Sequence, residues 1–169
     1  MKIIGLDIST RITGWSIFEN EQYVKSGNIN LERTGKKIDV RLKIMSTQIL
    51  QLLYREKPDV IVVESGYIGK NPKVALDLMR VRSVPFFYSL VANVLVLEPE
   101  PSEWRSILGF QSYGGQRTKY KKLVVKYVDK HFKQDVGDDE ADAICLALSY
   151  INEYVAIGKY FCDVELEEE

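Results

Sequence analysis

Four acidic residues occupy positions where a carboxylate could serve chemistry. Asp7 and Glu64 each end an apolar run, and Asp139 and Asp142 lie three apart in a helical pattern. Residues three apart share one face of a helix. In open α/β sheets, ligands bind at the carboxyl ends of the strands. Oxygen ligands without nearby His or Cys favour Mg²⁺ or Mn²⁺ over zinc. Four converging carboxylates would suit two ions, an arrangement that cleaves phosphodiesters.

The neighbouring acids have a simpler interpretation. Asp138 and Glu140 belong to the first turn of the expected helix, where acids complement the helix dipole and cap free amides. Asp142 lies deeper, between Ala141 and Ala143, so capping does not explain it. Its small neighbours indicate that the helix approaches another element closely.

Length and composition predict one soluble domain. The 169 residues suffice to bury a core without disulfides, and we expect the domain to span residues 1–157, followed by an acidic tail over 158–169. Cys145 and Cys162 lack metal-binding spacing, so a reduced compartment is expected. The N-terminus lacks a signal-peptide pattern, and no apolar run reaches about 18 residues. We therefore expect a cytoplasmic protein with no membrane association.

The hydrophobic pattern predicts an α/β fold. Its mixed central sheet would contain a three-strand antiparallel meander plus parallel strands, with helices on both faces. The expected strands are the opening apolar run, 13–19, 22–29, 59–64 and 94–97. The expected helices are 37–55, 72–92, one from Ser102, 116–132 and 139–154, with a loop at 109–115.

The helix at 72–92 has two notable features. Pro85 predicts a break or kink in its middle. Beyond Pro85, Phe86 and Phe87 help to place apolar groups on more than one side of the helix. Such a helix needs two apolar partners, which could be the sheet and a second subunit, or else the helix is fully buried within one chain.

Charge is unevenly distributed, although the net charge is only −1. Residues 101–133 hold eight Lys or Arg against two acids. This pattern is typical of a surface that binds a phosphate backbone, and a solvated helix face is the alternative explanation.

Together, the order of elements and the placement of the acids resemble the ribonuclease H-like nucleases, and within them the RuvC family of Holliday junction resolvases, most of all its phage-encoded members. One departure is Ile8-Ser9, where bacterial members usually have Pro-Gly. The motifs that carry the resemblance are Gly5-Leu6-Asp7, Thr13-Gly14, Glu64 to Tyr67, Lys70-Asn71, Ala75-Leu76 and Asp139 to Ala143.

The resemblance implies a homodimeric, metal-dependent endonuclease that cuts four-way junctions with symmetric paired nicks, and other branched DNA as a further candidate. It implies catalysis and metal binding by Asp7, Glu64, Asp139 and Asp142, with two Mg²⁺ ions per active site, for which Mn²⁺ would substitute. Tyr67 would stack on bases at the junction centre. The expected DNA-binding residues are Tyr67, Lys70, Arg105, Arg117, Lys119, Lys121, Lys122 and Lys126, and Phe86 and Phe87 are expected at the dimer interface.

Two other functions are compatible with parts of the sequence. Gly5-Leu6-Asp7-Ile8-Ser9-Thr10 also resembles the phosphate loop of actin-like and sugar-kinase ATPases, although those proteins are far longer. A non-catalytic junction-binding protein would keep the basic helix, but it would not need all four acids. No helicase partner is indicated by the sequence.

Overall fold

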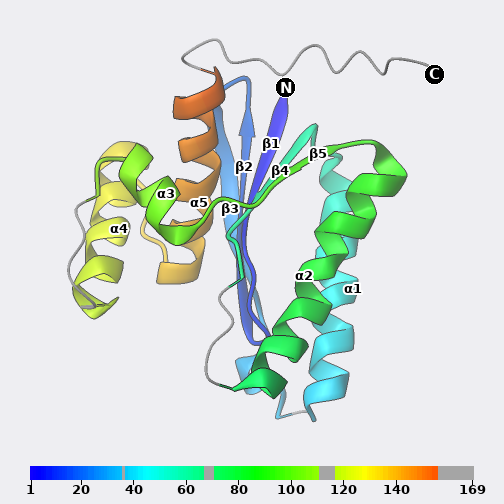
Figure 1. Ribbon diagram of the computed structural model, residues 1–169. Coiled ribbons are helices and arrows are strands. Elements are labelled where there is room, and N and C mark those ends of the chain that lie inside the picture. Colours follow the sequence, from blue (N-terminus) through cyan, green and yellow to red (C-terminus); the bar gives the residue numbers. More distant parts are fainter. Residues whose placement is uncertain (36, 67–70, 111–116, 156–169) are drawn as a thin grey trace.

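A five-stranded mixed sheet forms the centre of the molecule (Figure 1). The computed structural model describes residues 1–35, 37–66, 71–110 and 117–155, so the expected tail at 158–169 lies outside the described residues. The strand order is β3-β2-β1-β4-β5. The first three strands are antiparallel, whereas β4 and β5 continue the sheet in parallel with β1, as predicted. Their bounds are β1 Lys2–Asp7, β2 Ile12–Glu19, β3 Gln22–Asn30, β4 Val60–Val63 and β5 Leu95–Leu97.

Helices cover both faces of this sheet. In Figure 1, α1 and α2 lie on one side, while α3, α4 and α5 lie on the other. Within the described part of the chain, no helix is long and apolar enough to span a bilayer. The helical elements are η1 Glu32–Thr34, α1 Ile38–Glu56, α2 Pro72–Ala92, α3 Pro101–Ile107, α4 Arg117–Phe132, α5 Asp138–Tyr150 and the π-helical turn η2 Ile151–Val155.

Helix α2 runs without interruption through Pro85. The predicted break is therefore wrong. Proline removes one intrahelical hydrogen bond, but Val81 and Tyr88 on either side of it are buried in the core beneath α1. This tertiary burial favours a continuous helix over the local preference of proline. The last expected helix also ends earlier than predicted, because regular α5 stops at Tyr150 and continues as the π-helical turn.

Alternation along β1 divides the core into two halves and fixes where Asp7 faces. Ile4 and Leu6 belong to the half beneath α1 and α2, and Ile3 belongs to the half beneath α5. Successive side chains of a strand point to opposite faces, so Gly5 and Asp7 share the α5 side with Ile3.

The turn after β1 is held by Ser9. Its hydroxyl donates to the carbonyl of Ile12 at 2.5 Å and accepts from the amides of Arg11 and Ile12. The Ile8-Ser9 departure from the bacterial pattern thus forms a closed turn through side-chain hydrogen bonds, a common role for serine in turns.

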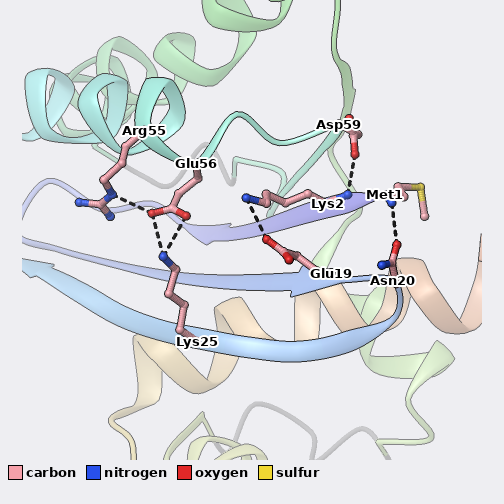
Figure 2. Close-up of polar contacts among 8 residues, drawn as sticks. All are labelled: Met1, Lys2, Glu19, Asn20, Lys25, Arg55, Glu56 and Asp59. Atoms are coloured by element: carbon pink, nitrogen blue, oxygen red, sulfur yellow. Dashed lines mark hydrogen bonds and ion pairs between the residues drawn. The ribbon is translucent and has the colours of Figure 1, made fainter.

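A buried carboxylate joins the edge strand β3 to the end of α1 (Figure 2). Glu56 is 5% exposed and accepts hydrogen bonds from Lys25 of β3 at 3.1 Å and from Arg55 at 2.7 Å. Burial disfavours its charged form, but the bonds from Arg55 and Lys25 outweigh burial and lower its pKa. The contact therefore stabilises the fold on the face opposite α5.

We expect Glu56→Gln to lower the free energy of unfolding by about 1–3 kcal/mol at neutral pH, because an amide loses charge-assisted hydrogen bonds. A lowered carboxyl pKa contributes stability above its ordinary value of 4.5 and loses it as the pH falls through the folded-state pKa. Urea unfolding at neutral and acidic pH tests this. Equal differences between the two proteins at both pH values would contradict it.

Candidate active site

Neighbouring parallel strands bring Asp7 and Glu64 to one edge of the sheet. Leu6 of β1 pairs with Val63 of β4, and the amide of Glu64 donates to the Leu6 carbonyl at 3.3 Å. Val60 and Val62 belong to the core half beneath α5. By the same alternation, Glu64 faces the α5 side, as Asp7 does.

Two glycines allow α5 to lie close to that edge. A Cβ added to Gly5 would stand 2.1 Å from the Ala143 carbonyl oxygen, and one added to Gly14 would stand 1.9 Å from the Asp139 carbonyl oxygen. Ser16 also donates to the Ala143 carbonyl at 2.8 Å. Helix α5 thus packs directly on β1 and β2, with Asp139 and Asp142 beside Asp7.

The four predicted acids act on one another electrostatically. Burial raises the pKa of Asp7 well above its usual range, and Asp142, Glu64 and Asp139 raise it further. Burial, followed by repulsion from Glu64, raises the pKa of Asp142 to about 7. The sequence argument therefore selected residues that the fold brings together.

The oxygen donors of these side chains have the chemistry that a divalent cation such as Mg²⁺ prefers. Asp142 is 7% exposed, and its Oδ1 is buried without a hydrogen-bond partner among the described residues. A bound cation would supply that partner and relieve the repulsion. In the described part of the chain, no three acidic, His or Cys side chains are close enough to form a complete metal cage. The four-carboxylate metal site accordingly stays a prediction.

Two predicted DNA-binding residues border the acid cluster. The Arg105 guanidinium lies 3.9 Å from Glu64 and covers the ring of Tyr120 at 4.0 Å from its centroid. Lys121 pairs with Asp138 at 2.5 Å. Both cations lower the pKa of Asp142, although burial still dominates. Arg105 and Lys121 therefore add positive charge next to the carboxylates.

The other predicted residues lie elsewhere. Lys119, Lys122 and Lys126 are exposed along α4, which Arg117 begins. Tyr67 and Lys70 lie outside the described residues. Phe86 and Phe87 are exposed on α2, on the other side of the sheet from α5 (Figure 1). Their exposure excludes the alternative that this half of the helix is buried within one chain.

Sequence reasoning missed Arg82. Its side chain is buried on α2, with the guanidinium near the backbone of Gly66 and 3.9 Å from Glu98. Burial lowers its pKa, while Glu98, Glu64 and Asp7 oppose that change. No local pattern distinguishes Arg82 from the exposed Arg80, because only the tertiary fold buries one and not the other.

The interpretation of Asp138 and Glu140 as simple capping acids also missed their contacts. Gly137 precedes the helix and gives no side-chain cap. Asp138 instead pairs with Lys121 of α4, and Glu140 accepts hydrogen bonds from Ser26 and Asn28 of β3. These partners are more than 15 residues away, so helix-capping rules could not find them.

The sheet order and topology define a ribonuclease H-like fold, with carboxylates at the ends of β1 and β4 and at the start of α5. Comparison with known structures agrees with this fold. Thermus thermophilus RuvC, solved in complex with a Holliday junction substrate, superposes with a TM-score of 0.71 at 16% identity, over 94% of this chain and 97% of that chain.

Sequence comparison gives the family. The model of the family described as crossover junction endodeoxyribonuclease RuvC matches residues 3–150. RuvC of Alkalilimnicola ehrlichii is 30% identical over 85% of this chain and 89% of its own. RuvC of Carboxydothermus hydrogenoformans is 30% identical over 87% and 93%. The chain belongs to the RuvC family of crossover junction endodeoxyribonucleases, which confirms the predicted resemblance and enzyme class.

Proposed function

We propose that this chain resolves Holliday junctions by divalent-metal-dependent hydrolysis, with Asp7, Glu64, Asp139 and Asp142 as its catalytic carboxylates. The observation that supports the assignment of residues is the partly buried, mutually repelling acid cluster at the end of β1. Mg²⁺ is the proposed ion and Mn²⁺ a substitute, because all four candidate ligands are hard oxygen donors.

The carboxylates would hold the metal, and nearby cations would hold the DNA. The chemistry supplied there by a divalent ion would be polarisation of the phosphate and activation of a water. Asp142 is the buried member of the cluster, and Asp7, Glu64 and Asp139 are half-buried. Arg105, which lies 3.9 Å from Glu64, would contact the backbone phosphate that is cut. Its replacement should then lower the cleavage rate more than the affinity for DNA.

Branched DNA is the proposed substrate and a second copy of the chain the proposed partner. The solved Thermus thermophilus relative is bound to a Holliday junction. In this chain, Tyr67 would stack on a base at the branch point. Two copies would place two acid clusters for symmetric nicks. The proposed backbone contacts are Lys70, Arg105, Arg117, Lys119, Lys121, Lys122 and Lys126.

We further propose that residues 1–157 form one nuclease domain, with 158–169 as an acidic tail, and that the protein acts in the cytoplasm, which is that of the host cell if the protein is phage-encoded. The ATPase and non-catalytic alternatives are not favoured. The family match extends across residues 3–150, and the four acids of a metal-dependent nuclease are all present.

Cleavage of a synthetic four-way junction tests this function directly. We expect paired nicks with Mg²⁺ or Mn²⁺, none with EDTA, and little cutting of a linear duplex with the same sequence. ATP hydrolysis measured alongside should be absent. Junction binding without metal-dependent cutting would instead support the non-catalytic alternative.

Removing single charges along α4 should weaken DNA binding equally for all sequences. We expect Lys122→Ala and Lys126→Ala each to reduce the salt dependence of junction binding by about one unit of slope, because each proposed phosphate contact releases about one counterion. Binding assays over a range of salt concentrations, without metal, measure the slope. Lys43→Ala, an exposed lysine on α1 at the other face, is the matched control. An unchanged slope in the α4 variants would remove those residues from the DNA surface.

A further inference from the structure

Helix α5 packs on two hydrogen-bonded strands of the sheet, β2 and β3. In the β2–β3 register, Gly14 lies opposite Asn28, and Ser16 lies opposite Ser26. Gly14 approaches the backbone at Asp139 and Glu140, and Ser16 donates to the Ala143 carbonyl. Asn28 and Ser26 donate to the side chain of Glu140. Strands β2 and β3 thus contact the same helical segment that carries Asp139 and Asp142.

Glu140 uses both of its oxygens in this contact. Ser26 Oγ donates to Oε1, and Asn28 Nδ2 donates to Oε2 at 3.0 Å. Ser26 Oγ also lies 2.8 Å from the hydroxyl of Tyr23, whose ring packs on Phe18 and Phe132. A carboxylate with two fixed donors has little freedom to rotate, so Glu140 ties the first turn of α5 to β3 at a defined position.

Close backbone contacts set the distance of this helix from the sheet, whereas side-chain contacts set its rotation. Gly5 and Gly14 set how near α5 comes to the sheet, and Ser16 together with the buried side chains of α5 holds the middle of the helix. Glu140 holds its first turn. Glu140 lies between Asp139 and Asp142 in the sequence, so a turn of the helix that breaks its contact also displaces both acids. Asp138, paired with Lys121 of α4, holds the same turn from another helix.

We propose that Glu140 is a positioning residue for the nuclease reaction, and that its contact with Ser26 and Asn28 keeps Asp139 and Asp142 beside Asp7 so that they can bind metal. This inference rests on the proposed function. Loss of groups that orient metal ligands typically weakens metal affinity or activity about 10- to 100-fold. Small displacements of reacting groups have effects of similar size.

The test compares Glu140→Ala with the double variant Ser26→Ala/Asn28→Ala, which removes the same contact from the strand. For the full chain, calorimetry measures Mn²⁺ affinity without DNA, and single-turnover assays measure junction cleavage across Mg²⁺ concentrations. We expect both variants to lose about 10- to 100-fold in Mn²⁺ affinity and cleavage rate, with unchanged junction affinity in EDTA. Combining all three substitutions should add little, because only one contact is removed. Glu140→Gln, which keeps an acceptor oxygen, should recover part of the loss.

Glu56→Gln is the matched control, since Glu56 ties β3 to α1 on the opposite face. It should lower stability but keep Mn²⁺ affinity and cleavage rate. The proposal is overturned if Glu140→Ala retains wild-type Mn²⁺ affinity, or if Glu56→Gln reproduces its defects at equal thermal stability. A defect in Glu140→Ala without one in the strand variant would also overturn it, because Glu140 would then act on the metal itself. A wild-type protein that binds no Mn²⁺ and cuts no junction would refute the proposed function instead.

Discussion

Asp7→Asn, Glu64→Gln and Asp142→Asn are each expected to reduce junction cleavage in Mg²⁺ by several orders of magnitude, while junction binding persists. Each change removes one proposed metal ligand but keeps the size of the side chain. Losing charge stabilisation at a reacting phosphate affects the transition state more than the binding of DNA. Single-turnover rates and binding in Ca²⁺ separate the two effects. A variant that keeps more than about a tenth of the wild-type rate would remove that residue from the site.

Stability measurements provide the control for these variants. The raised pKa of Asp142, about 7, means that the folded metal-free protein holds a proton that the unfolded chain releases at lower pH. The stability associated with this proton is complete below the ordinary value of 3.8 and is lost as the pH rises through about 7. Asp142→Asn carries no such charge, so its thermal unfolding in EDTA above pH 7 should occur at or above the wild-type temperature. Unfolding at a clearly lower temperature would indicate a core role instead.

The same protons link metal binding to pH. Asp7 and Asp142 both have raised pKa values, and a metal ion bound at the proposed site would have to displace the protons that they hold. Metal affinity should therefore fall as the pH is lowered through about 7, and Asp142→Asn should weaken that pH dependence together with the affinity.

The sequence predicted structure best where residues close together in the chain decide it. Apolar runs ending in Asp7 and Glu64 indicated buried strands with acids at a sheet edge, and the Asp139–Asp142 spacing placed two more acids on one helix face. The expectation that proline breaks a helix failed at Pro85, because burial of Val81 and Tyr88 outweighs the preference of proline. Sequence patterns also could not reveal the contacts of Glu140, since its partners Ser26 and Asn28 become neighbours only when β3 pairs beneath α5.

Arg82 is a second residue whose surroundings could not be predicted from local sequence patterns. A helix with mixed charges predicts exposed arginines, and Arg80 is indeed exposed and paired with Asp77 at 2.8 Å. Arg82 is two positions further along the helix and points into the protein, towards Gly66. Helical periodicity predicts that Arg80 and Arg82 lie on different faces of α2. Which of these faces points towards Gly66 is decided by the packing of α2 on α1.

Phe87→Glu is expected to convert a dimer into monomers without unfolding the chain. A four-way junction has approximate two-fold symmetry, and a two-fold dimer would place one acid cluster at each of two related strands. The far half of α2 exposes apolar side chains: Phe86 is 52% exposed, Phe87 61%, Leu90 65% and Val91 78%. An exposed apolar group of this kind is typical of a protein interface.

The physical reason for a large effect is that a carboxylate at the centre of an apolar contact would be buried without a partner in the dimer, whereas it stays hydrated in the monomer. Sedimentation measures the oligomeric state, circular dichroism the fold, and a cruciform plasmid distinguishes paired cuts from single nicks. We expect Phe87→Glu to sediment as a folded monomer and to leave mostly nicked circles. Val24→Glu, at a residue of β3 that is 47% exposed, should remain dimeric and make paired cuts. A wild-type protein that is monomeric on junction DNA and still makes both cuts in one binding event would refute the dimer mechanism, because a single acid cluster would then have to reach both strands.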